Sequence, residues 1–368
     1  MNILYDHQIF SRQKFGGISR YFCELVRAIP ALEGDKVEVF APFHVNEYTN
    51  SLGPAIFNGM KLHRFRGAGF VLGMTNAVLA RVLVKPRCDV QIFHETYYSK
   101  AEFSPKASKR VVTVYDMIHE RFPGSFSRRD RTSEYKQHAV RRADHVICIS
   151  ESTRHDLITM FDVPVEKTSV VHLGFALNYM DSFGAPSPNF GKPYLLYVGA
   201  RGGYKNFEIL LRAYAHSKAL TGGFALVCFG GGSVTVRERS LLASAGVTDA
   251  EVFFMGGDDK LLSSLYSSAA AFIYPSLYEG FGIPPLEAMS HGCPVICTNT
   301  SSLPEVAGDA AEFFDPYSQE ELQSAIERVV SSPTRTALLV SKGYQRIKRF
   351  SWEKCARETL NAYKNLLD

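Results

Sequence analysis

The segment AAFIYPSLYEGFGIPPLEAMSHG, residues 270–292, holds in order an apolar run, a glycine-rich loop and a helix start. The run AAFIYPS is short and continuously apolar, which is typical of a strand covered on both faces. Pro284 suits a first helical turn, because a backbone N–H at this position has no acceptor within the helix and its absence costs nothing. Gly292 suits the helix end. The segment therefore predicts a strand, a loop and a helix, the unit from which α/β folds are built.

The same unit recurs in both halves of the chain. In the first half the apolar runs are MNILYD (1–6), KVEVFAP (36–42), VQIFH (90–94), RVVTVYD (110–116) and HVICIS (145–150). In the second half they are PYLLYVG (193–199), FALVCFGG (224–231), EVFFMG (251–256), AAFIYPS (270–276) and PVICTN (294–299). Helical patterns separate the runs, so we expect an α/β protein with two Rossmann-like, doubly wound parallel-sheet domains that face each other across a cleft.

A polar stretch broken by glycine and proline, FALNYMDSFGAPSPNFGKP, lies between the halves and reads as an interdomain linker, which we place near residues 176–192. We set the first domain at residues 1–180 and the second at 181–350. In such sheets ligands bind beyond the carboxyl ends of the strands, so the chemistry is expected in the loops that follow strands.

The composition is that of a soluble globular protein, with 368 residues, 46% hydrophobic and 21% charged. Seven cysteines without paired spacing and the lack of a membrane-length apolar run favour a cytoplasmic chain. The formal charge of +4 is too small to indicate nucleic acid binding. The basic segment at residues 128–142 reads either as a solvated helix face or as a surface attracted to an anionic membrane leaflet.

Two glycine-rich loops are candidates for binding phosphate. Gly16 and Gly17 precede a helical pattern, where free amides favour an anion, although a plain turn is the alternative. Arg201 and Lys205 follow a strand end and are separated by glycines, and two cations at such a turn suit a diphosphate. Asn206 is suited to cap the next helix.

Two carboxylates bracket the start of the helix in the opening segment. Glu279 precedes the helix and Glu287 lies within about its first turn, while the first amides of this helix are unpaired. Because a carboxylate binds vicinal hydroxyls through paired hydrogen bonds, two of them suit a ligand with two diols, such as a ribose and a hexose.

These motifs together resemble the retaining glycosyltransferases of the GT-B group, family 4, which use nucleotide-diphosphate sugars and include bacterial surface-polysaccharide mannosyltransferases. The resemblance spans nearly the whole chain. It rests on the early GGISRY, on VICISESTRHDL and VVHLG, on YVGARGGYKN, on FMGGDDKLLSSLYSSAAAFIYPS and on the two glutamates.

The resemblance implies roles for the donor-binding residues. The glutamate matching Glu279 contacts the hydroxyls of the donor sugar, and the one matching Glu287 binds the nucleotide ribose. Arg201 and Lys205 match the cations that hold the diphosphate. The amides after Glu279 assist, and the early glycines lie near the phosphates, while the base is recognised around Met255; the residues concerned are Gly280, Phe281, Gly282, Ile283, Gly16 and Gly17.

The first domain is expected to hold the acceptor and the group that handles its proton. His94, Asp116 and His119 are the candidates, since each lies at or just after a strand end. Many family members carry His-Asp where this chain has Tyr115-Asp116, so a catalytic histidine at that position is in doubt. The family also implies that the C-terminal helix, residues 351–368, crosses back to the first domain; packing on its own domain is the alternative.

The sequence thus predicts a retaining, metal-independent hexosyltransferase without cofactor, acting on a nucleotide-sugar donor and a saccharide or lipid-linked acceptor. Mannose from GDP-mannose, for surface polysaccharide or O-antigen, is the preferred pair, with UDP-glucose or UDP-N-acetylglucosamine as alternative donors. A non-catalytic sugar-nucleotide-binding protein is a further alternative. A nicotinamide oxidoreductase is disfavoured because no complete G-x-G-x-x-G fingerprint is present. Peripheral contact with the inner membrane face stays open.

Overall fold

The structure is a computed structural model, which describes residues 1–65, 67–175, 188–244, 246–248 and 251–368. The chain divides into two compact units, and each is described by itself. Unit 1 comprises Met1–Gly174 together with Phe350–Asp368, and unit 2 comprises Phe175–Arg349. Most of the expected linker, residues 176–187, lies outside the described residues.

Unit 1 is built on a six-stranded parallel sheet with the order β2-β1-β5-β6-β7-β8. Its strands are β1 (Asn2–Tyr5), β2 (Lys36–Val39), β5 (Ile92–Glu95), β6 (Lys109–Val114), β7 (His145–Cys148) and β8 (Thr168–Val170). The direction of winding reverses between β1 and β5, because β2 lies on one side of β1 and all later strands lie on the other. The loops after β1 and β5 therefore meet at the switch point of this sheet.

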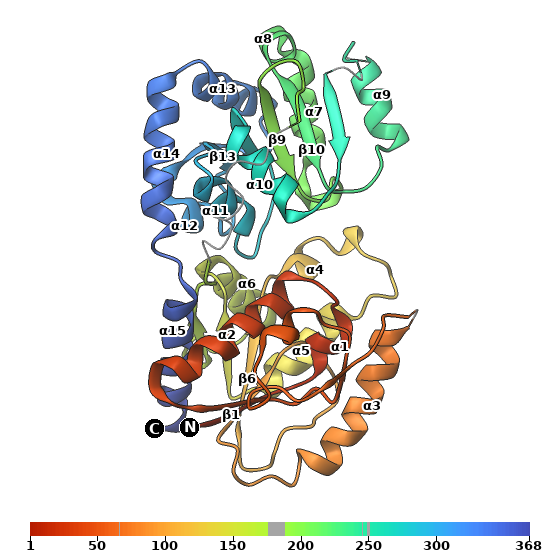
Figure 1. The fold of residues 1–368 in the computed structure, drawn as a ribbon, viewed down its shortest axis with the longest axis vertical. Coiled ribbons are helices and arrows are strands. Elements are labelled where there is room, and N and C mark those ends of the chain that lie inside the picture. The colour runs from red at the N-terminus through yellow and green to blue at the C-terminus, as the bar shows by residue number, and fades with distance from the viewer. Residues whose placement is uncertain (66, 176–187, 245, 249–250) are drawn as a thin grey trace. The chain divides into compact units, whose positions relative to one another are not determined.

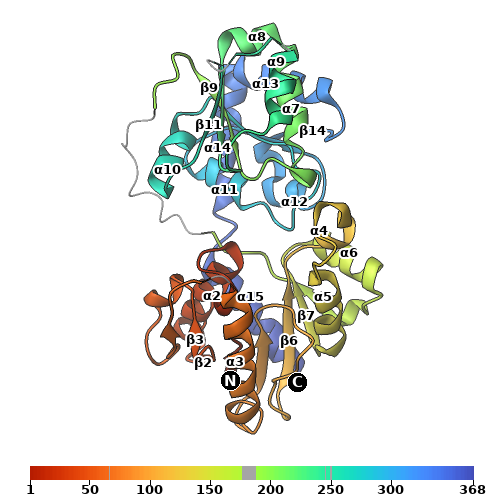
Figure 2. The same cartoon turned by 90° about the vertical axis from the view of Figure 1, so that its right-hand side faces the viewer.

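Helices cover both faces of this sheet (Figure 1, Figure 2). They are α1 (Gln8–Arg12), α2 (Gly17–Glu33), α3 (Ala68–Leu83), α4 (Ile118–Arg121), α5 (Thr132–Arg142), α6 (Glu151–Phe161) and α15 (Trp352–Leu367). A two-stranded parallel sheet, β3 (Phe43–His44) with β4 (Met60–Lys61), lies next to α3. The helix α15 packs against α2, so the end of the chain belongs to the same unit as its start.

Unit 2 repeats the architecture with the strand order β11-β10-β9-β12-β13-β14. Its strands are β9 (Tyr194–Val198), β10 (Ala225–Phe229), β11 (Val252–Met255), β12 (Ala271–Tyr274), β13 (Val295–Thr298) and β14 (Ala311–Phe314). In sequence order this is 3-2-1-4-5-6, the dinucleotide-binding arrangement, and all its pairings are parallel. The switch point lies between β9 and β12.

The helices of unit 2 are α7 (Phe207–His216), α8 (Lys218–Gly223), α9 (Val236–Ser244), α10 (Asp259–Ser268), α11 (Ile283–Ser290), α12 (Leu303–Ala307), α13 (Gln319–Val330) and α14 (Pro333–Ile347). All four residues of β12 and of β13 are buried. A strand buried on both faces has no polar side to alternate with, which is why these strands are continuous apolar runs in the sequence.

The expected fold class is confirmed, and every expected strand is present. Four strands were not anticipated: β3 and β4, which form the small sheet, and β8 and β14, which each lie at the edge of a large sheet. The edge strand β14 carries Glu312, whose carboxylate pairs with Arg328 and Arg335. Edge strands commonly carry such charges, and the charge interrupts the apolar run by which a strand is recognised.

Candidate functional site

The switch point of unit 2 brings together two residues that lie 74 positions apart in the sequence. Lys205 ends a short 3₁₀ turn after β9, and Glu279 lies in the loop after β12. The Lys205 ammonium donates to the Glu279 carboxylate at 2.7 Å, and the two side chains are 17% and 10% exposed. The backbone joins the same two loops, because the Leu277 amide donates to the Tyr204 carbonyl at 2.8 Å. A cation and an anion are therefore held side by side at the place where this fold binds ligands.

The loop that carries Glu279 is fixed by hydroxyl groups from the following loop, after β13. Ser301 accepts a hydrogen bond from the Glu279 amide at 2.9 Å. Ser302, which is fully buried, donates to the carbonyls of Glu279 and Phe281 at 2.9 and 2.7 Å. Ser301 has φ of +52°, a conformation that a non-glycine residue adopts at a cost. These hydroxyls hold the backbone of Glu279 in one position.

The helix α11 begins directly after this loop, as the sequence predicts. Gly282 is its N-cap with φ of +110°, and a Cβ at this position would lie 2.8 Å from the Leu303 side chain. Glycine is thus required twice over, by the backbone conformation and by the space. Ile283 is the first helical residue, and prolines follow it in the first turn.

The second glutamate, Glu287, lies on α11 one turn after the helix start and is partly buried. The Tyr266 hydroxyl of α10 donates to its carboxylate at 3.3 Å. Its carbonyl accepts from Ser290 and His291, so its backbone is tied to the helix end. The carboxylate and the helix that carries it thus have fixed positions.

The side chain of Arg201 is held by contacts within unit 2. Its side chain is only 4% exposed, and Nε donates to Glu238 at 2.8 Å. The two Nη atoms donate to three carbonyls of the loop after β10, those of Gly230, Gly232 and Ser233. These contacts use four of the five N–H groups of the guanidinium and hold the loop 230–233 in place. The contact of Arg201 with a diphosphate stays a prediction.

Two other expectations in unit 2 concern backbone groups. Met255 ends β11, and its carbonyl accepts the Gly230 amide at 2.9 Å, so it borders the same loop. Asn206 occupies the N-cap of α7, but its side chain makes no capping bond and instead donates to the Pro316 carbonyl at 2.8 Å. Asn206 thus takes the predicted N-cap position, with φ of +54°, but without a capping hydrogen bond from its side chain.

Arg201 also lines a pocket of about 390 Å³. Its lining comes from α7, α9 and the turns before them, including Glu208 and Glu238, and it includes neither Lys205 nor Glu279. This cavity is therefore distinct from the place where Lys205 and Glu279 pair.

The early glycines of unit 1 begin α2, with Gly16 as N-cap and Gly17 as first helical residue. One of the helix-start amides that were expected to be free has an acceptor in the protein, since the Ser19 amide donates to the Gln13 side chain at 3.1 Å. A Cβ at Gly16 would collide with that same side chain. Gln13 thus caps the helix from outside, and its signal in the sequence was not recognised.

His94 is a core residue. It is fully buried, and its ring nitrogens bond the hydroxyls of Tyr363 and Thr113, at 2.5 and 2.9 Å. Burial lowers the pKa of His94 to about 3. An imidazole with both nitrogens bonded and no exposed surface cannot exchange a proton with an acceptor, so the expectation of a catalytic role for His94 is corrected to a structural one.

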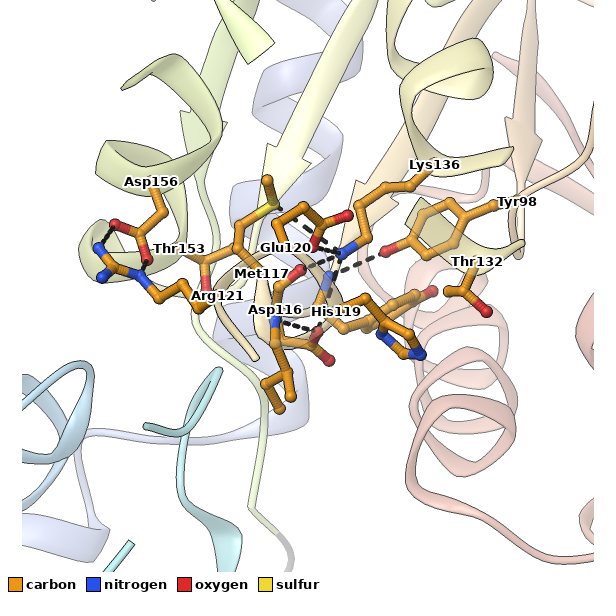
Figure 3. A network of polar contacts seen from close by, with 12 residues as sticks. Tyr98, Asp116, Met117, His119, Glu120, Arg121, Thr132, Lys136, Thr153 and Asp156 are labelled. Carbon is orange, nitrogen blue, oxygen red and sulfur yellow. Dashed lines mark hydrogen bonds and ion pairs between the residues drawn. The ribbon is translucent and has the colours of Figure 1, made fainter. Parts of the chain in front are cut away.

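Asp116 follows β6 and keeps 29% of its side chain exposed. Figure 3 shows the Lys136 ammonium of α5 pointing into the turn that Asp116 begins. The side chain of Lys136 is fully buried, and Nζ donates to the Asp116 carbonyl and to the Glu120 carboxylate, both at 2.7 Å. The Asp116 carboxylate accepts the Ile118 amide at 3.0 Å and lies 3.8 Å from Nζ. Asp116 is thus an accessible carboxylate on a turn fixed by a buried cation.

His119 lies in the same turn, within α4, and stacks on Phe126 with ring centroids 3.8 Å apart. Its Nε2 is 3.8 Å from Asp130, and its Nδ1 is buried without a hydrogen-bond partner among the described residues. The stacking fixes the plane of the ring. Tyr115, which replaces the histidine of many family members, is buried and donates to the Thr96 carbonyl at 3.2 Å.

Within the described residues, no group of three or more His, Cys, Asp or Glu side chains is placed to hold a metal ion. None of the helices in those parts of the chain is both long and apolar enough to pass through a bilayer.

Sequence reasoning missed the groups that position the candidate residues: Ser301, Ser302, Lys136 and Gln13. The hydroxyl run TNTSS after a buried strand was a usable signal, since loops after strands were already the expected place for chemistry. Lys136 gave no signal, because a lysine in a basic helix normally faces solvent.

Comparison with known proteins places each half of the chain in a family. Residues 15–179 match the profile "Glycosyltransferase Family 4", and residues 182–346 match "Glycosyl transferases group 1". The chain is also 28% identical to the O-antigen chain mannosyltransferase B of Escherichia coli over 369 aligned positions, which cover 95% of this chain and 96% of the relative.

Solved structures share the fold. A sucrose-phosphate synthase from Thermosynechococcus elongatus superposes with a TM-score of 0.75 at 20% identity, covering 100% of this chain and 99% of that one. HepE from Anabaena, in complex with UDP, superposes with a TM-score of 0.67 at 17% identity, covering 99% and 100% of the two chains.

Proposed function

The chain belongs to the group 1 glycosyltransferases, with an amino-terminal half of family 4, and on that premise we propose that it transfers mannose from GDP-mannose. The acceptor is a saccharide or lipid-linked saccharide of a surface polysaccharide such as O-antigen, and the reaction takes place in the cytoplasm. The choice of mannose is supported by the name of the E. coli relative, which aligns over nearly the full length of both chains.

The observation that carries the proposal is the pair of Lys205 and Glu279 at the switch point of unit 2. A nucleotide-diphosphate sugar offers a partner to each member of this pair. Its diphosphate is an anion for the ammonium, and the sugar hydroxyls are donors for the carboxylate. The donor can therefore replace the internal ion pair by an ion pair between Lys205 and the diphosphate and by hydrogen bonds from the sugar hydroxyls to Glu279, so that neither charge loses its partner.

Glu287 completes the donor site in this proposal. Its carboxylate, oriented by Tyr266, accepts hydrogen bonds from the two ribose hydroxyls. The amides at the start of α11, those of Gly282 and Ile283, add positive potential next to the leaving phosphate.

We propose a retaining, metal-independent mechanism. The bond between the anomeric carbon and the diphosphate breaks, and the electron pair stays on the phosphate, where Lys205 and the α11 amides stabilise the charge. The acceptor oxygen bonds to the anomeric carbon on the face that the phosphate leaves, and its hydroxyl proton is lost. Asp116 is our candidate for that proton, because its carboxylate is accessible whereas His94 is buried.

The donor is tested by thermal shift of the full chain with GDP, UDP and ADP, since the preferred nucleotide stabilises most. GDP should give the largest shift. A specific observation favours UDP as second candidate, because HepE, which shares the fold, was solved with UDP; a larger shift with UDP would replace GDP-mannose by a UDP-sugar.

The catalytic assignment is tested by Glu279→Gln, with Glu287→Gln as the matched control. Loss of a sugar contact made by Glu279 should lower kcat and leave GDP affinity nearly unchanged, whereas Glu287→Gln should weaken GDP binding. Unchanged turnover in Glu279→Gln with every donor would refute the sugar role. Absence of turnover in the unmodified chain, with GDP bound, would favour a non-catalytic binding protein.

Metal independence has its own measurement. Turnover should persist in excess EDTA, because the phosphate charge is neutralised by Lys205 and amides. Activity lost in EDTA and restored by added Mg²⁺ would contradict this part of the mechanism.

A further inference from the structure

The helix α3 lies on the outside of unit 1, at its right-hand edge in Figure 1 and in front in Figure 2. One face of α3 is firmly packed, since Ala68, Leu72 and Ala80 belong to hydrophobic clusters with neighbouring strands. Asn76, on the same face, is fully buried and exchanges hydrogen bonds with the Phe43 backbone at 3.1 and 2.7 Å. The opposite face is therefore fixed toward the outside.

That opposite face is apolar. We call it the outer face of α3, and it consists of Phe70, Val71, Met74, Val78 and Val82. Phe70, Met74, Val78 and Val82 recur every fourth residue, form one stripe along the helix and are 73%, 56%, 58% and 65% exposed. Soluble proteins normally expose apolar residues singly, and a contiguous patch marks an interaction surface.

The surroundings of the outer face are basic. Residues 60–88 contain six Lys+Arg and neither Asp nor Glu. Two of these cations are neutralised by acids elsewhere, Lys61 by Glu47 and Arg87 by Glu38. Arg64, Arg81 and Lys85 have no acidic partner within the part of the chain that the structure describes. An apolar stripe flanked by unpaired cations is the pattern of a helix that lies in a membrane interface.

We propose that the outer face of α3 docks onto an anionic lipid bilayer. The helix lies parallel to the membrane, with its aliphatic and aromatic side chains at the boundary of headgroups and acyl chains. Arg64, Arg81 and Lys85 attract the anionic headgroups. The inference goes beyond the proposed function and does not depend on it, because no residue of the donor site takes part.

A lipid surface fits better than a second copy of this chain. In a twofold dimer the same face meets itself, so the three cations of each copy would approach those of the other without an acid between them. The basic segment at residues 128–142, which the sequence suggested for membrane contact, fits less well. Its Lys136 is buried, and Arg142 and Arg131 pair with Glu95 and Glu134.

The first experiment measures co-sedimentation of the full chain with vesicles of phosphatidylcholine and phosphatidylglycerol in equal parts. The unmodified chain should bind these vesicles and bind pure phosphatidylcholine less. Val78→Glu should reduce the partition coefficient about tenfold, because it places a charge in the apolar boundary. The matched control is Val236→Glu, an exposed helical valine of unit 2, which should leave binding unchanged.

The second experiment tests the charges. The double variant Arg81→Glu and Lys85→Glu should weaken binding by about tenfold or more, since each basic residue contributes about 1 kcal/mol near an anionic surface. Added salt should reduce the difference. The control is Arg128→Glu with Arg129→Glu, which makes the same charge change on exposed residues of the other basic segment.

Three outcomes would overturn the proposal: no vesicle binding by the unmodified chain, equal losses in variant and control, or a dimer in sedimentation that Val78→Glu dissociates while vesicle binding stays the same. Thermal melts and GDP binding of each variant show whether it is folded. Both should be unchanged, and this separates a failure of docking from a failure of the donor site.

Discussion

The two sheets differ most at the place where their topologies agree, the switch point. In unit 1 it lies between β1 and β5, where Asp6 is buried and accepts hydrogen bonds from Gln8 and Thr96. In unit 2 it lies between β9 and β12, where Lys205 and Glu279 pair and their side chains are 17% and 10% exposed.

Under the proposed function, the difference lies in the partners of the charges at each switch point. The carboxylate of Asp6 has four donors, all from its own unit, and a ligand that displaced them would leave buried donors unpaired. Lys205 and Glu279 pair with each other, and a ligand that carries both an anion and hydroxyls can supply a new partner to each of them. Under the proposed function, the same fold thus provides structural support in unit 1 and the donor site in unit 2.

The largest effect is expected from a substitution of the buried Asp6 at the switch point of unit 1. Asp6→Ala should lower the free energy of unfolding by about 4 kcal/mol, because several buried donors lose their acceptor. Asp6→Asn, which keeps one oxygen, should cost less. Urea denaturation measures both, and GDP affinity of the folded fraction should be unchanged; a lower GDP affinity at full stability would mean that Asp6 acts on the ligand.

A substitution at the switch point of unit 2 should weaken ligand binding. Lys205→Ala should weaken GDP binding by about 3 kcal/mol, as expected for a charged hydrogen bond to the diphosphate, and guanosine binding much less. Calorimetry on both ligands measures this, with the exposed Lys218→Ala as control. Equal losses for GDP and guanosine would contradict the diphosphate assignment.

The buried His94 should make the stability of the chain depend on pH. Burial lowers its pKa to about 3 in the folded chain, while the unfolded chain binds this proton below about pH 6.5. Stability therefore falls as the pH drops below 6.5, by about 2 kcal/mol at pH 5. His94→Gln should remove that part of the slope in pH-dependent denaturation. Replacement of the exposed His138 by Gln should leave the slope unchanged, and an unchanged slope in His94→Gln would exclude a buried neutral imidazole.

The smallest effect is expected from the hydroxyls behind Glu279. Ser302→Ala removes two hydrogen bonds to the Glu279 loop and should lower the free energy of unfolding by about 1 kcal/mol. Because Glu279 then moves more freely, kcat should fall while the KM for the donor changes little. Ser331→Ala, which removes one exposed helix-end hydroxyl, is the control. A change in KM alone would mean that Ser302 does not position Glu279.

The sequence was sufficient for most strands of the two large sheets and for the loops that meet in unit 2. Long apolar strands leave a local pattern, and the glycines and prolines of residues 279–287 mark a turn that few residues can form. It was not sufficient for the partners of polar groups. Arg201, His94 and Lys136 are each defined by contacts 16 to 269 positions away, and no local pattern distinguishes a buried, bonded side chain from an accessible one.

The placement of α15 has a consequence for how the chain is made. Tyr363 of this helix bonds both Tyr5 and His94 in the core of unit 1. A ribosome synthesises residues 350–368 only after all of unit 2, so unit 1 emerges first and is completed last. Until Tyr363 is synthesised, Tyr5 and His94 lack this hydrogen-bond partner. Unit 2 is therefore complete on the nascent chain, and able to fold, before unit 1 is.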